Sequence, residues 1–251
     1  MRSKERRTLL LEALKAGEAD VEHLARRFEV SASTVRRDLQ RLADENAVRR
    51  TYGGAILASP ASETSLGERL ATYGEQKRAI ARAALALVED GDTLILDAGS
   101  TVAAFGRLLR GRRVRVVTNN LVLPSMLAEA PGVELVVLGG AVRPTSMGSV
   151  GPLAMEAMRR ITADRVFMSA DGVVAGRGLC EASLDQVALK SLMMEQGREV
   201  VVLAHAAKLG RADQSAWAAL PASWTLVTDQ HADREQVANL EGYGATAIVA
   251  A

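Results

Sequence analysis

The sequence is poor in several residue types, and each shortage excludes a class of protein. Its single cysteine, Cys180, cannot form an internal disulfide, so a disulfide-stabilised scaffold is excluded. Aromatic residues make up only 3% of the 251 residues, too few for stacking platforms that bind single-stranded nucleic acid. The only histidines are His23, His205 and His231, and they have no partners at metal-ligand spacing. We therefore expect no metal site and no cofactor.

Long apolar runs are also missing. The longest, such as Leu135–Leu138 and Val200–Ala204, are too short to cross a bilayer, and the first residues lack the apolar stretch of a secretory signal. We therefore expect a soluble cytoplasmic protein without a membrane partner.

Net charge is nearly absent, but its distribution is uneven. The whole chain has 31 basic and 30 acidic residues, which by itself argues against binding to nucleic acid. Residues 1–57, however, have 12 basic and 9 acidic side chains, a net charge of +3, and the remainder has 19 and 21, a net charge of −2. The sequence therefore predicts a basic DNA-binding domain at 1–57, a linker at 58–75 and a second domain at 76–251.

Hydrophobic periodicity predicts three helices in the first domain. The first begins at Ser3, the second spans Val21–Phe28 after the capping residue Asp20, and the third begins after Ser31. Two short helices joined by about three residues are typical of a helix-turn-helix.

The third helix has a buried stripe formed by Val35, Leu39 and Leu42, so its other side chains face outward. In a helix-turn-helix, the N-terminal part of this second helix enters the major groove of DNA. Two arginines and a Gly-Gly turn follow in a β-compatible run, which predicts a wing. The predicted DNA contacts are Ser31, Ala32, Ser33, Thr34, Arg36, Arg37, Gln40, Arg41, Arg49, Arg50, Thr51, Tyr52 and Gly53.

The second domain alternates β-rich runs with helical stretches, which predicts an α/β fold with a mainly parallel sheet covered on both faces. The predicted strands are Thr93–Leu96, Val114–Val117, Val133–Leu138, Arg165–Ser169, Glu199–Ala204, Trp224–Val227 and Thr246–Val249. Ligands bind such sheets outside the carboxyl ends of the strands.

Polar residues follow most of these strand ends. Gly99, Ser100 and Thr101 begin a helix, and its free N–H groups would bind an anion. Lys208 follows the fifth strand, where it could neutralise a phosphate or pair with Asp97 or Asp171, and His205 is either a packed histidine or a ligand. The predicted ligand-binding residues are Asp97, Gly99, Ser100, Thr101, Thr118, Asn119, Asn120, Gly139, Gly140, Asp171, Gly172, Glu181, Lys190 and Lys208.

The motifs in both halves resemble those of DeoR-family bacterial transcriptional regulators. The resemblance rests on Val30–Leu39 and Arg50–Ala55 in the first half, and on Asp97–Thr101, Asp171-Gly172 and Lys208–Gly210 in the second. It implies a winged helix-turn-helix and a larger α/β domain, similar to ribose-5-phosphate isomerase, that senses a phosphorylated sugar.

The resemblance also implies residue roles. It would place the phosphate near Gly99, Ser100, Thr101 and Lys208, and the sugar hydroxyls near Asp97, Asn119, Asp171 and Glu181. The chain departs from the family pattern at Tyr52, where most members have histidine, at Asn120, which replaces a frequent serine, and at His205-Ala206-Ala207, where an acidic residue and hydroxyls are common.

We therefore expect a repressor of carbohydrate metabolism genes that binds a double-stranded DNA operator as a homo-oligomer, a dimer or tetramer, and is released by a sugar phosphate. The alternative is an isomerase-like enzyme with an appended helical domain, in which Asp171 or Glu181 is the base. A nucleotide-binding oxidoreductase is a weaker alternative, because no strand is followed by the G-x-G-x-x-G pattern.

Overall fold

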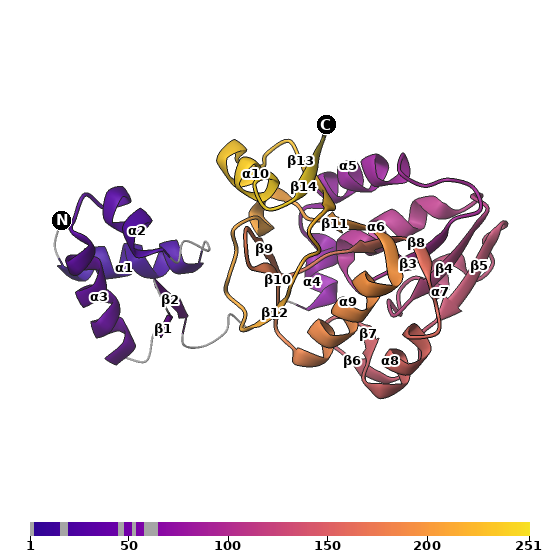
Figure 1. The fold of residues 1–251 in the computed structure, drawn as a ribbon, viewed down its shortest axis with the longest axis horizontal. Helices are drawn as coiled ribbons and strands as arrows, with labels where there is room; N and C mark the ends of the chain where they lie inside the picture. The colour runs from indigo at the N-terminus through magenta and orange to yellow at the C-terminus, as the bar shows by residue number, and fades with distance from the viewer. Residues whose placement is uncertain (1–2, 16–19, 45–47, 52–53, 58–64) are drawn as a thin grey trace.

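The computed structural model describes residues 3–15, 20–44, 48–51, 54–57 and 65–251, which form an N-terminal and a C-terminal unit (Figure 1). Two predicted DNA contacts, Tyr52 and Gly53, lie outside the described residues.

The N-terminal unit has the predicted three helices and two-stranded wing. Its elements are α1 (Ser3–Lys15), α2 (Val21–Arg27), α3 (Ala32–Asp44), β1 (Val48–Thr51) and β2 (Gly54–Leu57), and the two strands pair antiparallel. The predicted caps are present: Asp20 Oδ1 accepts from the His23 N–H at 2.7 Å, and Ser31 Oγ accepts from the Thr34 N–H at 3.2 Å.

A small apolar core and one buried ion pair hold the N-terminal helices together. The predicted stripe of α3, formed by Val35, Leu39 and Leu42, is buried with residues of α1 and α2. Next to it, Arg6 Nε of α1 donates to Asp38 Oδ2 of α3 at 2.6 Å, and Asp38 is only 2% exposed. This pair fixes the side of α3 that is opposite its exposed face.

All seven predicted strands of the second domain exist and form one parallel sheet. They are β3 (Thr93–Leu96), β4 (Val114–Thr118), β5 (Val133–Val137), β8 (Ala163–Met168), β11 (Gly197–Leu203), β13 (Trp224–Asp229) and β14 (Ala245–Ala250). Their order across the sheet is β14-β13-β11-β8-β3-β4-β5, and every neighbouring pair is parallel.

Helices cover both faces of this sheet, as the alternation of strands with helices predicts. Along β3, Leu94 and Leu96 pack with α5 (Gly74–Leu85) and α6 (Ser100–Gly106), while Ile95 between them packs on the other face. That other face is covered by α8 (Pro152–Met158), α9 (Leu184–Gln196) and α10 (Arg234–Glu241). The remaining helices are α4 (Leu66–Ala71), η1 (Arg107–Leu109), α7 (Pro124–Leu127) and η2 (Ala206–Lys208).

Two features of this domain differ from the sequence prediction. Five short strands pair outside the main sheet: β6 (Ala141–Arg143), β7 (Gly148–Val150), β9 (Gly172–Val174), β10 (Gly178–Glu181) and β12 (Ala216–Ala218). With three or four residues each, they are too short to show a period. The predicted linker 58–75 also contains a folded segment, because α4 and the start of α5 lie within it. Leu66 is 4% exposed, so apolar burial orders this segment.

The Arg6–Asp38 pair predicts a stability effect in the N-terminal unit. Asp38→Ala leaves the guanidinium of Arg6, whose side chain is 13% exposed, without its partner. We expect the free energy of unfolding of the N-terminal unit to fall by about 2–3 kcal/mol, somewhat less than for a fully buried pair. Amide hydrogen exchange in α1 and α3 of the full chain measures it. The exposed Asp44→Ala on the same helix is the control, and equal exchange rates in both variants would contradict the prediction.

Candidate functional site

Helix α3 carries seven of the thirteen predicted DNA contacts, and five of these are exposed. The side chains of Ser33, Arg36, Arg37, Gln40 and Arg41 are exposed, whereas Ala32 and Thr34 are half-buried. Arg49, Arg50 and Thr51 lie on β1 of the wing. The exposed face of α3 therefore offers three guanidinium groups and the Ser33 hydroxyl on one surface, as binding to a DNA backbone and groove requires.

Local contacts orient the start of this face. The hydroxyl of Ser31 lies 2.8 Å from the hydroxyls of both Ser33 and Thr34. Arg36 Nη2 donates to Glu22 Oε1 of α2 at 3.1 Å, with both side chains more than half exposed. Glu22 therefore restrains the direction of one of the two adjacent arginines, a role that the sequence did not predict.

A pocket lies at the carboxyl ends of the central strands. It has a volume of about 100 Å³, and we call it the strand-end pocket. Its lining residues are Arg69, Thr72, Tyr73, Lys77, Ser100, Asp171, His205, Ala207, Lys208, Arg211 and Gln214. Only three of these, Ser100, Asp171 and Lys208, were among the predicted ligand-binding residues.

Lys208 is buried in the wall of this pocket. Its Nζ atom donates to Ser169 Oγ at 3.3 Å and to the carbonyl of Ala170. Burial, together with the nearby charges of Arg69 and Lys190, lowers the pKa of Lys208 to about 8, although Asp171 opposes this shift. Lys208 does not pair with Asp97, one of its two expected partners, because the carboxylate of Asp97 is bound to Lys190.

Three further cations line the pocket: Arg69, Lys77 and Arg211. Sequence reasoning did not identify them as pocket residues. Lys77 of α5 is 4% exposed, and its Nζ atom donates to the carbonyls of Arg69 and Thr72. Burial, then the charges of Lys208 and Arg69, lowers the pKa of Lys77 to about 8. Arg211 Nε donates to both carboxylate oxygens of Asp213, at 2.8 and 2.7 Å.

Asp171 is the carboxylate that lines the pocket, and its hydrogen bonding is incomplete. Its Oδ1 atom lies 3.5 Å from Arg69 Nη1, whereas its Oδ2 atom is buried and has no hydrogen-bond partner. A buried acceptor without a donor is costly. The pocket is therefore suited to a ligand that supplies a hydroxyl donor to Asp171.

An aromatic pair forms another wall. The rings of Tyr73 and His205 stack with centroids 4.2 Å apart. Burial, together with the charges of Lys208 and Lys77, lowers the pKa of His205 to about 3, so the imidazole is neutral. Its Nδ1 atom is buried without a hydrogen-bond partner. His205 is thus both packed and available to a ligand.

Three predicted ligands are occupied with one another next to the pocket. Lys190 of α9 is 2% exposed and pairs with Asp97 and with Glu181 Oε1, the latter at 3.1 Å. Burial opposes its charge, but the two carboxylates raise the pKa of Lys190 above its ordinary value. Burial also raises the pKa of Glu181 to about 7. This cluster supports the pocket from outside its lining.

The predicted amides also hold the loops in place. Asn120 Nδ2 donates to the carbonyls of Asp97 and Gly99, at 3.3 and 3.2 Å, and Asn119 Nδ2 donates to the Ser149 carbonyl at 3.0 Å. Thr118 Oγ1 donates to the carbonyl of Leu96. Thr101 Oγ1 is buried without a hydrogen-bond partner, but Thr101 is outside the pocket lining.

Two of the four predicted glycines of the ligand site, Gly140 and Gly172, serve close packing of the backbone. A Cβ atom at Gly172 would lie 1.9 Å from the Arg211 carbonyl oxygen, so glycine lets the Arg211 loop approach β9. Gly140 has a φ of +132° and would place a Cβ atom 2.4 Å from the Val150 oxygen. At Gly99 a Cβ atom would make ordinary contact with Ser169, and Gly139 has open space around it.

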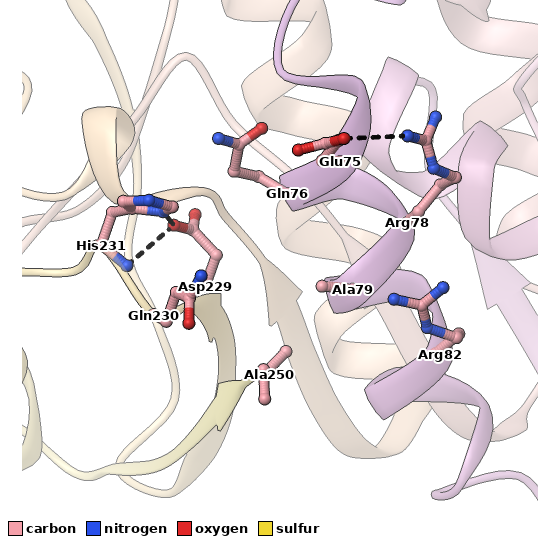
Figure 2. A pocket seen from close by; sticks show the side chains of 10 residues that line it. Glu75, Gln76, Arg78, Ala79, Arg82, Asp229, Gln230, His231 and Ala250 are labelled. Carbon is pink, nitrogen blue, oxygen red and sulfur yellow. Dashed lines mark hydrogen bonds and ion pairs between the residues drawn. The ribbon is translucent and has the colours of Figure 1, made fainter.

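A second pocket, of about 360 Å³, lies between α5 and the ends of β13 and β14 (Figure 2). In it, Glu75 Oε1 lies 4.0 Å from Arg78 Nη2, and Asp229 Oδ1 lies 2.9 Å from His231 Nδ1. The pocket shares no lining residue with the strand-end pocket. Asp229 also accepts from the Ala206 N–H at 2.8 Å, which orients the η2 turn that carries Lys208.

Other kinds of site are not found in the part of the chain that the structure describes. Among those residues, no group of three His, Cys, Asp or Glu side chains could hold a metal ion. No helix among them is long and apolar enough to span a membrane. Burial raises the pKa of Cys180 to about 12, so its thiol is not a nucleophile at neutral pH.

Both units match domains of one protein family. Residues 6–61 match the DeoR-like helix-turn-helix domain, and residues 73–230 match the DeoR C terminal sensor domain.

Relatives of known name cover nearly the whole chain. The HTH-type transcriptional repressor GlcR of Bacillus subtilis (strain 168) is 32% identical over 232 residues, 92% of this chain and 90% of that protein. The glycerol-3-phosphate regulon repressor of Escherichia coli (strain K12) is 31% identical over 213 residues, 84% of each chain. The transcriptional regulator GlpR of Haloferax volcanii is 31% identical over 230 residues, 91% of this chain and 90% of that protein.

A solved structure with a related fold is ribose 5-phosphate isomerase A from Methanocaldococcus jannaschii. It has a TM-score of 0.41 and 21% identity, and the match covers 55% of each chain. So slight a likeness does not bear on function, and the full-length relatives above are named as regulators and not as isomerases. The chain belongs to the DeoR family of DNA-binding transcriptional regulators, with an N-terminal helix-turn-helix and a C-terminal sensor domain.

Proposed function

We propose that this regulator is a repressor of carbohydrate metabolism genes, controlled by a phosphorylated sugar that binds in the strand-end pocket. The observation that carries the proposal is the charge of that pocket. Arg69, Lys77, Lys208 and Arg211 line it, together with the carboxylate of Asp171, and the carboxylate of Asp213 pairs with Arg211. A net charge of +2 among these buried or half-buried groups matches a phosphate dianion.

The uncharged part of the ligand has partners as well. Asp171 Oδ2 and His205 Nδ1 are buried without hydrogen bonds, and Ser100 lines the same pocket. Sugar hydroxyls can donate and accept at these positions. The name of the glycerol-3-phosphate regulon repressor supports a small phosphorylated polyol or sugar as the class of effector.

In the proposed mechanism, α3 enters the major groove of a double-stranded operator in the cytoplasm, and the wing contacts the DNA backbone. At least two copies of the chain, assembled as a dimer or tetramer, would place their α3 helices on repeated half-sites of the operator. Effector binding favours an arrangement of the units that releases DNA, and a coupling free energy of about 1–3 kcal/mol is enough. The proposal requires no cofactor besides the effector.

Lys208→Met tests the pocket. Removing one charged donor to phosphate should weaken effector binding by about 1.5–3 kcal/mol, while DNA binding in the absence of effector is retained. A thermal-shift screen of phosphorylated sugars against the wild-type and variant proteins measures this change. Arg78→Gln, in the pocket of Figure 2, is the control. Equal ligand-induced shifts in wild type and Lys208→Met would exclude Lys208 from the phosphate site.

The depressed lysine pKa values predict a pH dependence of effector affinity. Lys77 and Lys208, with pKa values of about 8, are mostly charged at neutral pH and lose their charge as pH rises. Affinity for a phosphate dianion should therefore fall by up to about tenfold per lysine between roughly pH 7 and pH 9. Calorimetric titrations across this range measure it. Lys208→Met should flatten the profile, and a wild-type affinity that is constant over the range would contradict the assignment.

Arg37→Ala tests the DNA face. Arg37 is exposed near the start of α3, where an arginine reads guanine. Its loss should weaken binding by about 1–3 kcal/mol to a duplex that the full-length protein selects from a random pool. Fluorescence anisotropy measures the affinity, with Arg82→Ala in the sensor domain as the control. Wild-type DNA affinity in Arg37→Ala would remove this residue from the interface.

A further inference from the structure

Helix α4 lies between the two units along the chain and contributes to the strand-end pocket. The wing ends at Leu57, residues 58–64 lie outside the described residues, and α4 begins at Leu66. Arg69 within α4 lines the pocket, as do Thr72 and Tyr73 just after it. The segment that leads to the DNA-binding unit is therefore itself a wall of the pocket.

One buried side chain and a set of polar contacts hold α4 against the sensor domain. Leu66 is buried, whereas most other residues of the helix are exposed. The Leu66 N–H and Arg69 Nη2 both donate to the Thr145 carbonyl, at 2.9 and 3.0 Å. A helix of six residues is not stable alone. The position of α4 therefore depends on these contacts, on the bonds that Lys77 donates to the carbonyls of Arg69 and Thr72, and on its capping box, in which Ser65 and Glu68 exchange hydrogen bonds.

The pocket end of α4 is held by groups that an anion would contact. Arg69 Nη1 lies 3.5 Å from Asp171 Oδ1, and the charge of Arg69 lowers the pKa of both Lys77 and Lys208, which line the same pocket. Like charges in a half-buried site repel one another. An anion between Arg69 and Lys208 would replace this repulsion with attraction on both sides and would draw α4 toward the sensor core.

The turn after α4 is strained, and the contacts that hold it are also at the pocket. Tyr73 has φ 53° and ψ 37°, a left-handed conformation that is uncommon for a bulky residue. Such a conformation persists where surrounding contacts hold it. The ring of Tyr73 stacks on His205, and Lys77 donates to the carbonyl of Thr72 immediately before the turn.

We infer that Arg69 is a positioning residue that couples the two units: an anion in the strand-end pocket fixes α4 through Arg69 and thereby restrains the DNA-binding unit. This inference rests on the proposed function, because it requires that the pocket bind an anion.

Hydrogen exchange of the full-length protein tests the coupling, with inorganic phosphate as the probe. Phosphate should slow exchange of the amides in residues 66–71 by about fivefold or more, the low end of typical allosteric couplings. Chloride at matched ionic strength should not slow it, and α10 serves as an internal reference. If phosphate raises the melting temperature but leaves exchange in α4 unchanged, the coupling through α4 is wrong and the proposed anion site is retained. If phosphate does not stabilise the wild-type protein at all, both the coupling through α4 and the proposed anion site are wrong.

Two variants separate binding from coupling. Ser65→Ala removes the capping box but no pocket residue, so phosphate affinity should be retained while the effect of phosphate on DNA affinity falls at least about fivefold. Asp233→Ala, which removes the N-cap of α10, is the matched control and should respond as wild type. Arg69→Gln should lose both phosphate affinity and the DNA response. A Ser65→Ala protein with a wild-type DNA response would overturn the inference.

Discussion

Burial of the Lys190 ammonium is the constraint on which the sensor domain depends most. An ammonium that is 2% exposed requires opposite charges and acceptors within reach. Asp97 after β3, Glu181 at the end of β10 and the Ser169 carbonyl after β8 supply them. One buried charge thus fixes three strand ends relative to α9. The strand-end pocket lies beside this cluster, so the part of its wall that the strand ends form is set before any ligand enters.

The strand-end pocket differs from the Lys190 cluster, because the charges in the pocket are not balanced. Lys208 and Lys77 are buried among carbonyl acceptors and other cations, and burial lowers the pKa of each to about 8. Protein interiors tolerate such an excess of like charge at a cost in stability. In the proposed function, an anionic effector relieves this cost, and the relief is the free energy available to change the arrangement of the units.

In the DNA-binding unit, one side of α3 is fixed by packing and the other side is exposed. Its apolar stripe and the Arg6–Asp38 pair fix one side of α3, which leaves Arg37 and its neighbours exposed on the other. This arrangement was predictable, because helix periodicity assigns each side chain to a face from local sequence alone. The seven main strands were also predictable from local sequence, because each is a short β-rich run that lies between helical stretches.

The sequence by itself determined the two units, the parallel sheet, the outward face of α3, and Ser100, Asp171 and Lys208 as residues of the strand-end pocket. Only the tertiary structure decided the rest of the pocket. Arg69, Lys77 and Arg211 carry no motif, and they meet because α4, α5 and the loop after η2 converge at one edge of the sheet. The tertiary structure also showed that Lys190 pairs with both Asp97 and Glu181. Strand order reveals which residues lie at a sheet edge, but side-chain partners depend on distances between segments far apart in the chain, and local sequence patterns do not encode those distances.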